Sequence, residues 1–168
     1  MADEIDLGDR EVLTWPLFGE ATRDLAQAVA DDGFEPDIVL AVARGGLTVA
    51  GALSYALAVK NCFAMNVEFY TGIDERLEVP VVLPPTLDLV DIQGLKVLVA
   101  DDVADTGKTL ELVRDVIDEH VAETRCAVLY QKPRTVIEAD YVWRHTDRWI
   151  NFPWSSEAPV VATEVLDA

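Results

Sequence analysis

The chain has 168 residues, enough for one domain whose hydrophobic core needs no disulfide or metal to hold it together. It carries 31 acidic and 13 basic residues, and its formal net charge of -18 repels DNA, RNA and anionic membranes, so we expect no nucleic-acid or membrane partner. The carboxylates are spread along the whole chain and lysine is scarce, which favours a halophilic protein of a saline cytoplasm over one with a local acidic interaction surface.

The sequence contains no pattern typical of export or membrane insertion. Its N-terminus is acidic, whereas a signal peptide begins with positive charge and continues with an apolar run. The apolar stretch from Val49 to Val59 is too short to span a bilayer. Cys62 and Cys126 lie far apart and have no metal-ligand spacing, which favours a reduced compartment. We therefore expect a cytoplasmic protein.

Apolar runs of strand length alternate with segments of helical periodicity. The first strand, residues 37–43, is apolar throughout, as expected of a strand that is covered on both faces. Gly33 suits the end of the helix that precedes it. In chain order, the sequence predicts a helix over 18–32, a strand over 37–43, a helix over 48–59, strands over 62–70 and 96–102, a helix over 109–120 and a strand over 125–132.

This alternation through short turns predicts an α/β fold with a doubly wound, Rossmann-like parallel sheet. No repeat or linker divides the chain, so residues 1–168 are expected to form a single domain with a core over about 13–132. Residues 70–93 are rich in proline and glycine and are expected to form a flap with some strand in 79–83. The tail, 133–168, is rich in tryptophan and proline and is expected to form a separate hood.

The segment VLVADDVADTGKTLELV, residues 97–113, raises three alternatives. A Walker phosphate loop requires a glycine five residues before Gly107, and Asp102 stands there, so the Gly-Lys-Thr tripeptide is no evidence for an ATPase. A helix cap alone would explain Asp105 and Thr106 but leaves two carboxylates at the end of a buried strand unexplained. The third alternative is a phosphate-binding turn at a helix N-terminus, beside two carboxylates that suit hydroxyl groups or a hydrated Mg²⁺.

This motif resembles the phosphoribosyl-diphosphate (PRPP) signature of the type I phosphoribosyltransferases. AVARGG is similar to the diphosphate-binding loop of that family, and residues 130–154 resemble the base-binding region of its xanthine-guanine members. The resemblance covers roughly residues 13–155. It implies a Mg²⁺-dependent transfer of the phosphoribosyl group to a purine and, from the habit of the family, a homodimer or homotetramer.

The resemblance also implies roles for individual residues. Asp101 and Asp102 would hold the ribose hydroxyls and Mg²⁺, directly or through water. Asp105 would lie beside N7 of the purine and is the candidate general acid or base. Arg76, in the flap, is the candidate that closes on the diphosphate, although a surface ion pair with its acidic neighbours is an equal alternative. The PRPP-binding set is expected to be Arg44, Gly45, Gly46, Asp101, Asp102, Asp105, Thr106, Gly107, Lys108 and Thr109.

For the base, the resemblance implies that Lys132 donates to an oxygen at C6, which selects 6-oxopurines over adenine. Trp149 would stack on the purine, and Ile150 would contact its edge. The expected function is purine salvage: xanthine, guanine or hypoxanthine and PRPP give the nucleoside 5′-monophosphate and diphosphate. Two alternatives stay open, namely a PRPP-sensing regulatory protein and a phosphoribosyltransferase for another nucleobase.

Overall fold

The computed structural model describes residues 9–72, 75–83 and 92–161, with backbone only between 68 and 83. Part of the expected flap, 73–74 and 84–91, lies outside these ranges. No helix in the described part of the chain is long and apolar enough to cross a membrane. In chain order the elements are β1 (Arg10–Val12), α1 (Trp15–Asp31), β2 (Ile38–Ala43), α2 (Gly46–Ala56), β3 (Cys62–Gly72), β4 (Glu75–Leu83), β5 (Lys96–Ala104), α3 (Lys108–Asp118), β6 (Glu123–Gln131), β7 (Tyr141–His145) and β8 (Trp149–Asn151).

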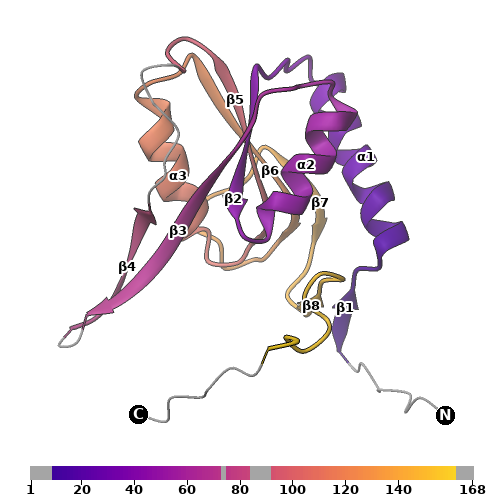
Figure 1. Ribbon diagram of the computed structural model, residues 1–168, viewed down its shortest axis with the longest axis vertical. Helices are drawn as coiled ribbons and strands as arrows, with labels where there is room; N and C mark the ends of the chain where they lie inside the picture. Colours follow the sequence, from indigo (N-terminus) through magenta and orange to yellow (C-terminus); the bar gives the residue numbers. More distant parts are fainter. Residues whose placement is uncertain (1–8, 73–74, 84–91, 162–168) are drawn as a thin grey trace.

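Six strands form the central sheet in the order β4-β3-β2-β5-β6-β7 (Figure 1). All neighbouring strands run parallel except β4, which is antiparallel to β3 and extends with it away from the body of the molecule (Figure 1). In the central strands Ala41 is paired with Ala64 and Ala100, and Ala100 is also paired with Ala127. The predicted α/β fold with a parallel sheet is confirmed.

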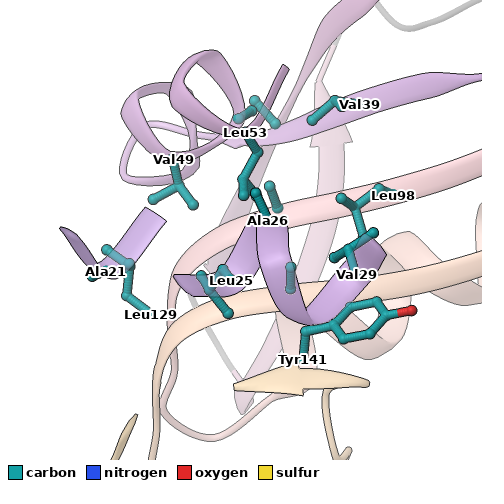
Figure 2. Close-up of a cluster of buried hydrophobic side chains, with 14 of the residues drawn as sticks. Ala21, Leu25, Ala26, Val29, Val39, Val49, Leu53, Leu98, Leu129 and Tyr141 are labelled. Atoms are coloured by element: carbon teal, nitrogen blue, oxygen red, sulfur yellow. The ribbon is translucent and has the colours of Figure 1, made fainter. Parts of the chain in front are cut away.

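Successive residues of the central strands enter two separate cores. Val39, Leu98 and Leu129 pack under α1 and α2, together with Leu25 and Leu53 (Figure 2). The alternate residues of the same strands pack under α3, on the opposite face of the sheet, and these are Ile38, Leu40, Val97, Val99 and Val128. Burial on both faces explains why these strands have continuous apolar runs instead of an alternating pattern.

The connections that follow β2 and β5 determine where the candidate site lies. From β2 the chain crosses one face through α2 to β3, and from β5 it crosses the other face through α3 to β6. The two connections diverge from adjacent strands and leave a crevice at the carboxyl ends of those strands, the usual ligand position in open α/β sheets. Both motifs singled out in the sequence, Arg44–Gly46 and Asp101–Thr109, lie at this crevice.

Three elements differ from the sequence expectations. Helix α1 begins at Trp15, before the predicted residue 18, because the Oγ1 of Thr14 accepts from the N–H of Leu17 at 3.3 Å and Pro16 suits the first turn. Helix α2 ends at Ala56, earlier than predicted, and Ala58 has a positive φ of 57°. Strand β1 was not predicted.

The C-terminal segment also differs from its prediction as a hood separate from the sheet. Strand β7 continues the central sheet, parallel to β6, so these residues do not belong to a separate hood, whereas the alternation of strands and helices ends after β6 as predicted. The smaller strand β8 pairs instead with β1, in a two-stranded sheet apart from the central one (Figure 1). The hood is therefore built from both ends of the described chain.

Candidate active site

The turn after β2 is pressed against β5. A Cβ atom on Gly46 would overlap the backbone carbonyl of Ala100, so only glycine fits there, and one on Gly45 would displace the carboxylate of Asp102. The peptide bond between Ala43 and Arg44 is cis. Helix α2 starts here without a side-chain cap, which leaves backbone N–H groups at its N-terminus available to an anion.

Asp101 and Asp102 lie in the last part of β5, which extends to Ala104 and is longer than predicted. Asp101 lines a hollow with the phosphate turn, Asp102 contacts Gly45, and the two carboxyl groups interact with each other. Burial raises the pKa of both carboxyls, and the neighbouring charge of Asp102 raises the pKa of Asp101 further.

This acidic pair suits a hydrated cation better than a protein cage. Within the residues that the structure describes, no three His, Cys, Asp or Glu side chains come together as a metal site. Two carboxylates with raised pKa values at a crevice gain from any positive charge that arrives with a ligand. The donor set therefore fits Mg²⁺ that keeps several water ligands.

The turn after β5 forms a phosphate-sized hollow of about 230 Å³. Gly107 occupies the left-handed region with φ 77° immediately before α3, and no side chain caps that helix. The first-turn N–H groups therefore remain available at the positive end of the helix dipole. The predicted residues that line this hollow are Asp101, Asp105, Thr106, Gly107 and Thr109.

A second, smaller hollow of about 110 Å³ adjoins the first and shares Val103 and Asp105 with it. The structure brings the three predicted base-binding residues together here, because Lys132, Trp149 and Ile150 all line this hollow. Trp149 is 68% exposed, and the Nζ of Lys132 lies 5.9 Å from the centre of its ring. Val103 and Phe152 also line the hollow and were not predicted from the sequence.

Backbone hydrogen bonds join the phosphate turn to the base-binding segment. The N–H of Lys132 donates to the carbonyl of Ala104 at 3.0 Å, and the N–H of Val136 donates to the carbonyl of Thr106 at 2.8 Å. Gly107 lies so close to Thr135 and Ile137 that a Cβ atom would collide with both side chains. The two hollows are thus held in a fixed relation by main-chain contacts.

Sequence reasoning missed Arg134, which forms a two-pronged ion pair with Asp105. Its Nε donates to Oδ1 at 2.7 Å and its Nη2 donates to Oδ2 at 2.5 Å. Hydrogen bonding by this guanidinium lowers the pKa of Asp105 below its usual value. Arg134 lies two residues after Lys132, but no motif marks it, and its contact depends on the shape of the intervening turn.

Strand β1 was also missed, and it holds β8 in place. Arg10 is paired with Trp149 and Glu11 with Ile150 in a parallel register. Two ion pairs reinforce the contact, one between Arg144 and Glu11 at 3.0 Å and one between Arg148 and Asp9 at 3.1 Å. The position of the base-binding residues therefore depends on the N-terminal strand.

Of the remaining predicted residues, those whose side chains the structure describes do not line the two hollows. Arg44 and Lys108 are exposed beside the two turns, and neither is among the residues that line the two hollows. Arg76 lies on β4, and its side chain is outside the described part of the structure. A larger hollow of about 710 Å³ lies at the opposite end of the sheet, near Phe34 and Lys60, and contains none of the predicted residues.

Comparison with known proteins agrees with this geometry. The model of the phosphoribosyl transferase domain family matches residues 9–159, and the chain belongs to this family. It is 31% identical over 153 residues to the xanthine-guanine phosphoribosyltransferase of Ruegeria sp. (strain TM1040), covering 84% of this chain and 83% of that protein. The family predicted from the sequence is confirmed.

Two solved structures resemble the whole fold. A purine phosphoribosyltransferase from Pyrococcus horikoshii superposes with a TM-score of 0.79 at 36% identity, over 94% of this chain and 100% of that chain. The Helicobacter pylori xanthine-guanine-hypoxanthine phosphoribosyltransferase gives a TM-score of 0.73 at 25% identity, over 86% and 93% of the two chains.

Proposed function

We propose that the protein transfers the phosphoribosyl group of PRPP to a 6-oxopurine and so serves purine salvage. The observation that carries this proposal is the pair of adjoining hollows that share Asp105, one built for an anion and one lined by a lysine and a tryptophan. In the reaction, the bond from C1 of the ribose to the diphosphate oxygen breaks. A bond from a purine ring nitrogen to C1 forms, and the ring N–H proton is released.

The phosphate turn would hold the 5′-phosphate of PRPP through the free N–H groups before α3 and the hydroxyls of Thr106 and Thr109. Asp101 and Asp102 would bind the ribose hydroxyls and, through water, Mg²⁺, which supplies charge neutralisation for the diphosphate. The turn at Arg44 would bind the diphosphate itself. The protein has a net charge of -18 and repels the anionic substrate at long range. The helix N-termini, Arg44 and Mg²⁺ would have to overcome this repulsion at the site.

Lys132 supports the choice of base. Its ammonium group has three donors and no acceptor, so it can pair with an oxygen at C6 of the purine but not with the amino group of adenine. Trp149 offers an exposed ring beside it for stacking. Asp105 would accept a hydrogen bond from the ring N–H of the base, and Arg76 would close on the diphosphate from the flap.

The chain is also proposed to act in the cytoplasm as a homodimer or homotetramer. Leu47, Tyr55 and Phe63 are large apolar side chains that are 47%, 93% and 43% exposed on α2 and β3. We propose that these exposed side chains contribute to a surface that a second copy covers. Light scattering after size exclusion in high salt tests this assembly, and a monomer at micromolar concentration would contradict it.

The function is tested by incubating the protein with PRPP, Mg²⁺ and each nucleobase in high salt, and by measuring monophosphate and diphosphate. We expect product with xanthine, guanine or hypoxanthine and little with adenine. Lys132→Gln should weaken selection against adenine and leave the dissociation constant for PRPP nearly unchanged. Tight PRPP binding without turnover of any 6-oxopurine would refute the enzyme and favour a PRPP sensor.

A further inference from the structure

Arg134 contacts Asp105 in a geometry that leaves the carboxylate able to accept further hydrogen bonds. The guanidinium fork takes one acceptor position on each oxygen, with N–O distances of 2.7 and 2.5 Å. A carboxylate has about four acceptor positions, so the fork leaves about two of them free. Asp105 can thus be held by Arg134 and still accept from a second donor.

The residues that line the hollows show where Arg134 lies relative to Asp105. Asp105 lines both the phosphate hollow and the base hollow, whereas Arg134 lines neither. It borders a third hollow of about 490 Å³, which Lys132 and Trp149 also line. The guanidinium is therefore not among the groups that line the hollow where Asp105, Lys132 and Trp149 meet.

The backbone that carries Arg134 is anchored on the phosphate turn. The N–H of Thr135 donates to the carbonyl of Lys132 at 3.2 Å and closes the turn on which Arg134 stands. The next residue, Val136, donates to Thr106 at 2.8 Å. Although the side chain of Arg134 is 65% exposed, its backbone has a fixed position relative to Asp105.

We propose that Arg134 is a positioning residue, which holds the carboxylate of Asp105 in one plane and aims its free acceptor positions at the ring N–H of the purine. This inference rests on the function proposed above. The lowered pKa of Asp105 agrees with it, because an ionised carboxylate is an acceptor only, and Arg134 and Lys132 are the cations that face it. A second reading, in which Arg134 competes with the base for Asp105, predicts the opposite effect on base affinity.

Two variants and one control separate these readings. Arg134→Gln removes the charge and the fork, while Arg134→Lys keeps the charge and loses the two-pronged geometry. Arg114→Gln is the matched control, because Arg114 pairs with Asp118 at 3.7 Å and with Asp140 at 3.9 Å, and none of the three lines the two hollows. The measurements are kcat and KM for the best 6-oxopurine and for PRPP, with the thermal midpoint as a check of folding.

We expect Arg134→Gln to lower kcat/KM for the base by roughly two- to fivefold, the upper part of the range that corresponds to an exposed ion pair. KM for PRPP should stay within about twofold, because the phosphate turn keeps its backbone contacts. Arg134→Lys should recover part of the loss, and Arg114→Gln should match the wild type.

An unchanged or lower base KM in Arg134→Gln, with kcat retained, would overturn the inference, and full activity of Arg134→Lys would overturn the role of the fork. If the wild type turns over no 6-oxopurine, the proposed function fails and the inference fails with it. If the wild type is active and Arg134→Gln equals it, only the inference fails.

Discussion

Gly45 and Asp102 are in contact across two strands, and the space between them has no room for even one methyl group. The contact joins the turn after β2 to the acidic pair on β5. The regions proposed to bind diphosphate and ribose are therefore positioned by the same close approach, and its two members can be tested directly.

Gly45→Ala should weaken PRPP binding by roughly tenfold or more, because the new methyl displaces Asp102 from the ribose region. Calorimetric titration with PRPP and Mg²⁺ measures the effect. Gly51→Ala is the control, since a Cβ atom there meets nothing within 4 Å on the same helix. It should leave affinity unchanged and stabilise α2 by about 0.5–1 kcal/mol. Equal PRPP affinity in both variants would contradict the contact as described.

Gly107→Ala should destabilise the protein by more than Gly33→Ala. Both glycines have positive φ, 77° and 71°, so alanine pays the left-handed penalty of about 1–2 kcal/mol at each. A Cβ atom on Gly107 would in addition collide with Thr135 and Ile137, whereas Gly33 has open space. Thermal unfolding should show a drop of roughly 2–4 °C per kcal/mol. If the two variants unfold at the same temperature, the turn and the base-binding segment are less closely packed than the structure shows.

Asp101→Asn should stabilise the free protein at neutral pH and abolish PRPP binding. Burial raises the pKa of Asp101 in the folded protein above its value in the unfolded chain. The contribution of Asp101 to the free energy of unfolding is therefore fully present below the unfolded pKa, and it is lost as the pH rises through the folded pKa. Asparagine removes that penalty and keeps an acceptor for the N–H of Asp102, which donates to Oδ1 at 2.8 Å. Unfolding at pH 7 and again near pH 4 measures the effect. The gain in thermal midpoint at pH 7 should shrink toward pH 4, and a gain that is the same at both values would contradict the assignment.

Salt should stabilise the protein. The net charge of -18 produces self-repulsion that weakens as the screening length falls from about 10 Å at 0.1 M to about 3 Å at 1 M. The same salt weakens surface ion pairs such as that between Arg144 and Glu11, but exposed pairs contribute little. The thermal midpoint measured in KCl from about 0.1 to 2 M should therefore rise. A flat or falling midpoint would contradict the adaptation to salt that the composition predicts.

The strands and the acidic site were predictable because their signals are local. The apolar run before Asp101 marks a buried strand, and the turn after Asp102 has the residues of a phosphate site. Lys132 and Trp149 became candidates only through the family resemblance, since neither has a distinctive pattern in its own neighbourhood. Their meeting at one hollow is a result of the fold.

Three of the missed features, β1, β7 and Arg134, depend on contacts between distant segments. Strand β1 has three residues, and only its pairing with β8 gives it an extended structure. Strand β7 ends with Arg144 and His145, and because of this polar end the sequence does not indicate a strand at the edge of the central sheet. Arg134 meets Asp105 because the turn after β6 is bonded to the turn after β5, a relation between residues 29 positions apart.

The main-chain bonds from Lys132 to Ala104 and from Val136 to Thr106 have a consequence for how such a protein can change its substrate. Backbone groups make these bonds, so substitutions between 132 and 136 other than proline can keep them. Lys132, the one residue of this segment that lines the proposed base hollow, can therefore vary while the phosphate turn keeps its shape. Under the proposed function, a single substitution at Lys132 can change the base preference without rebuilding the proposed site for PRPP.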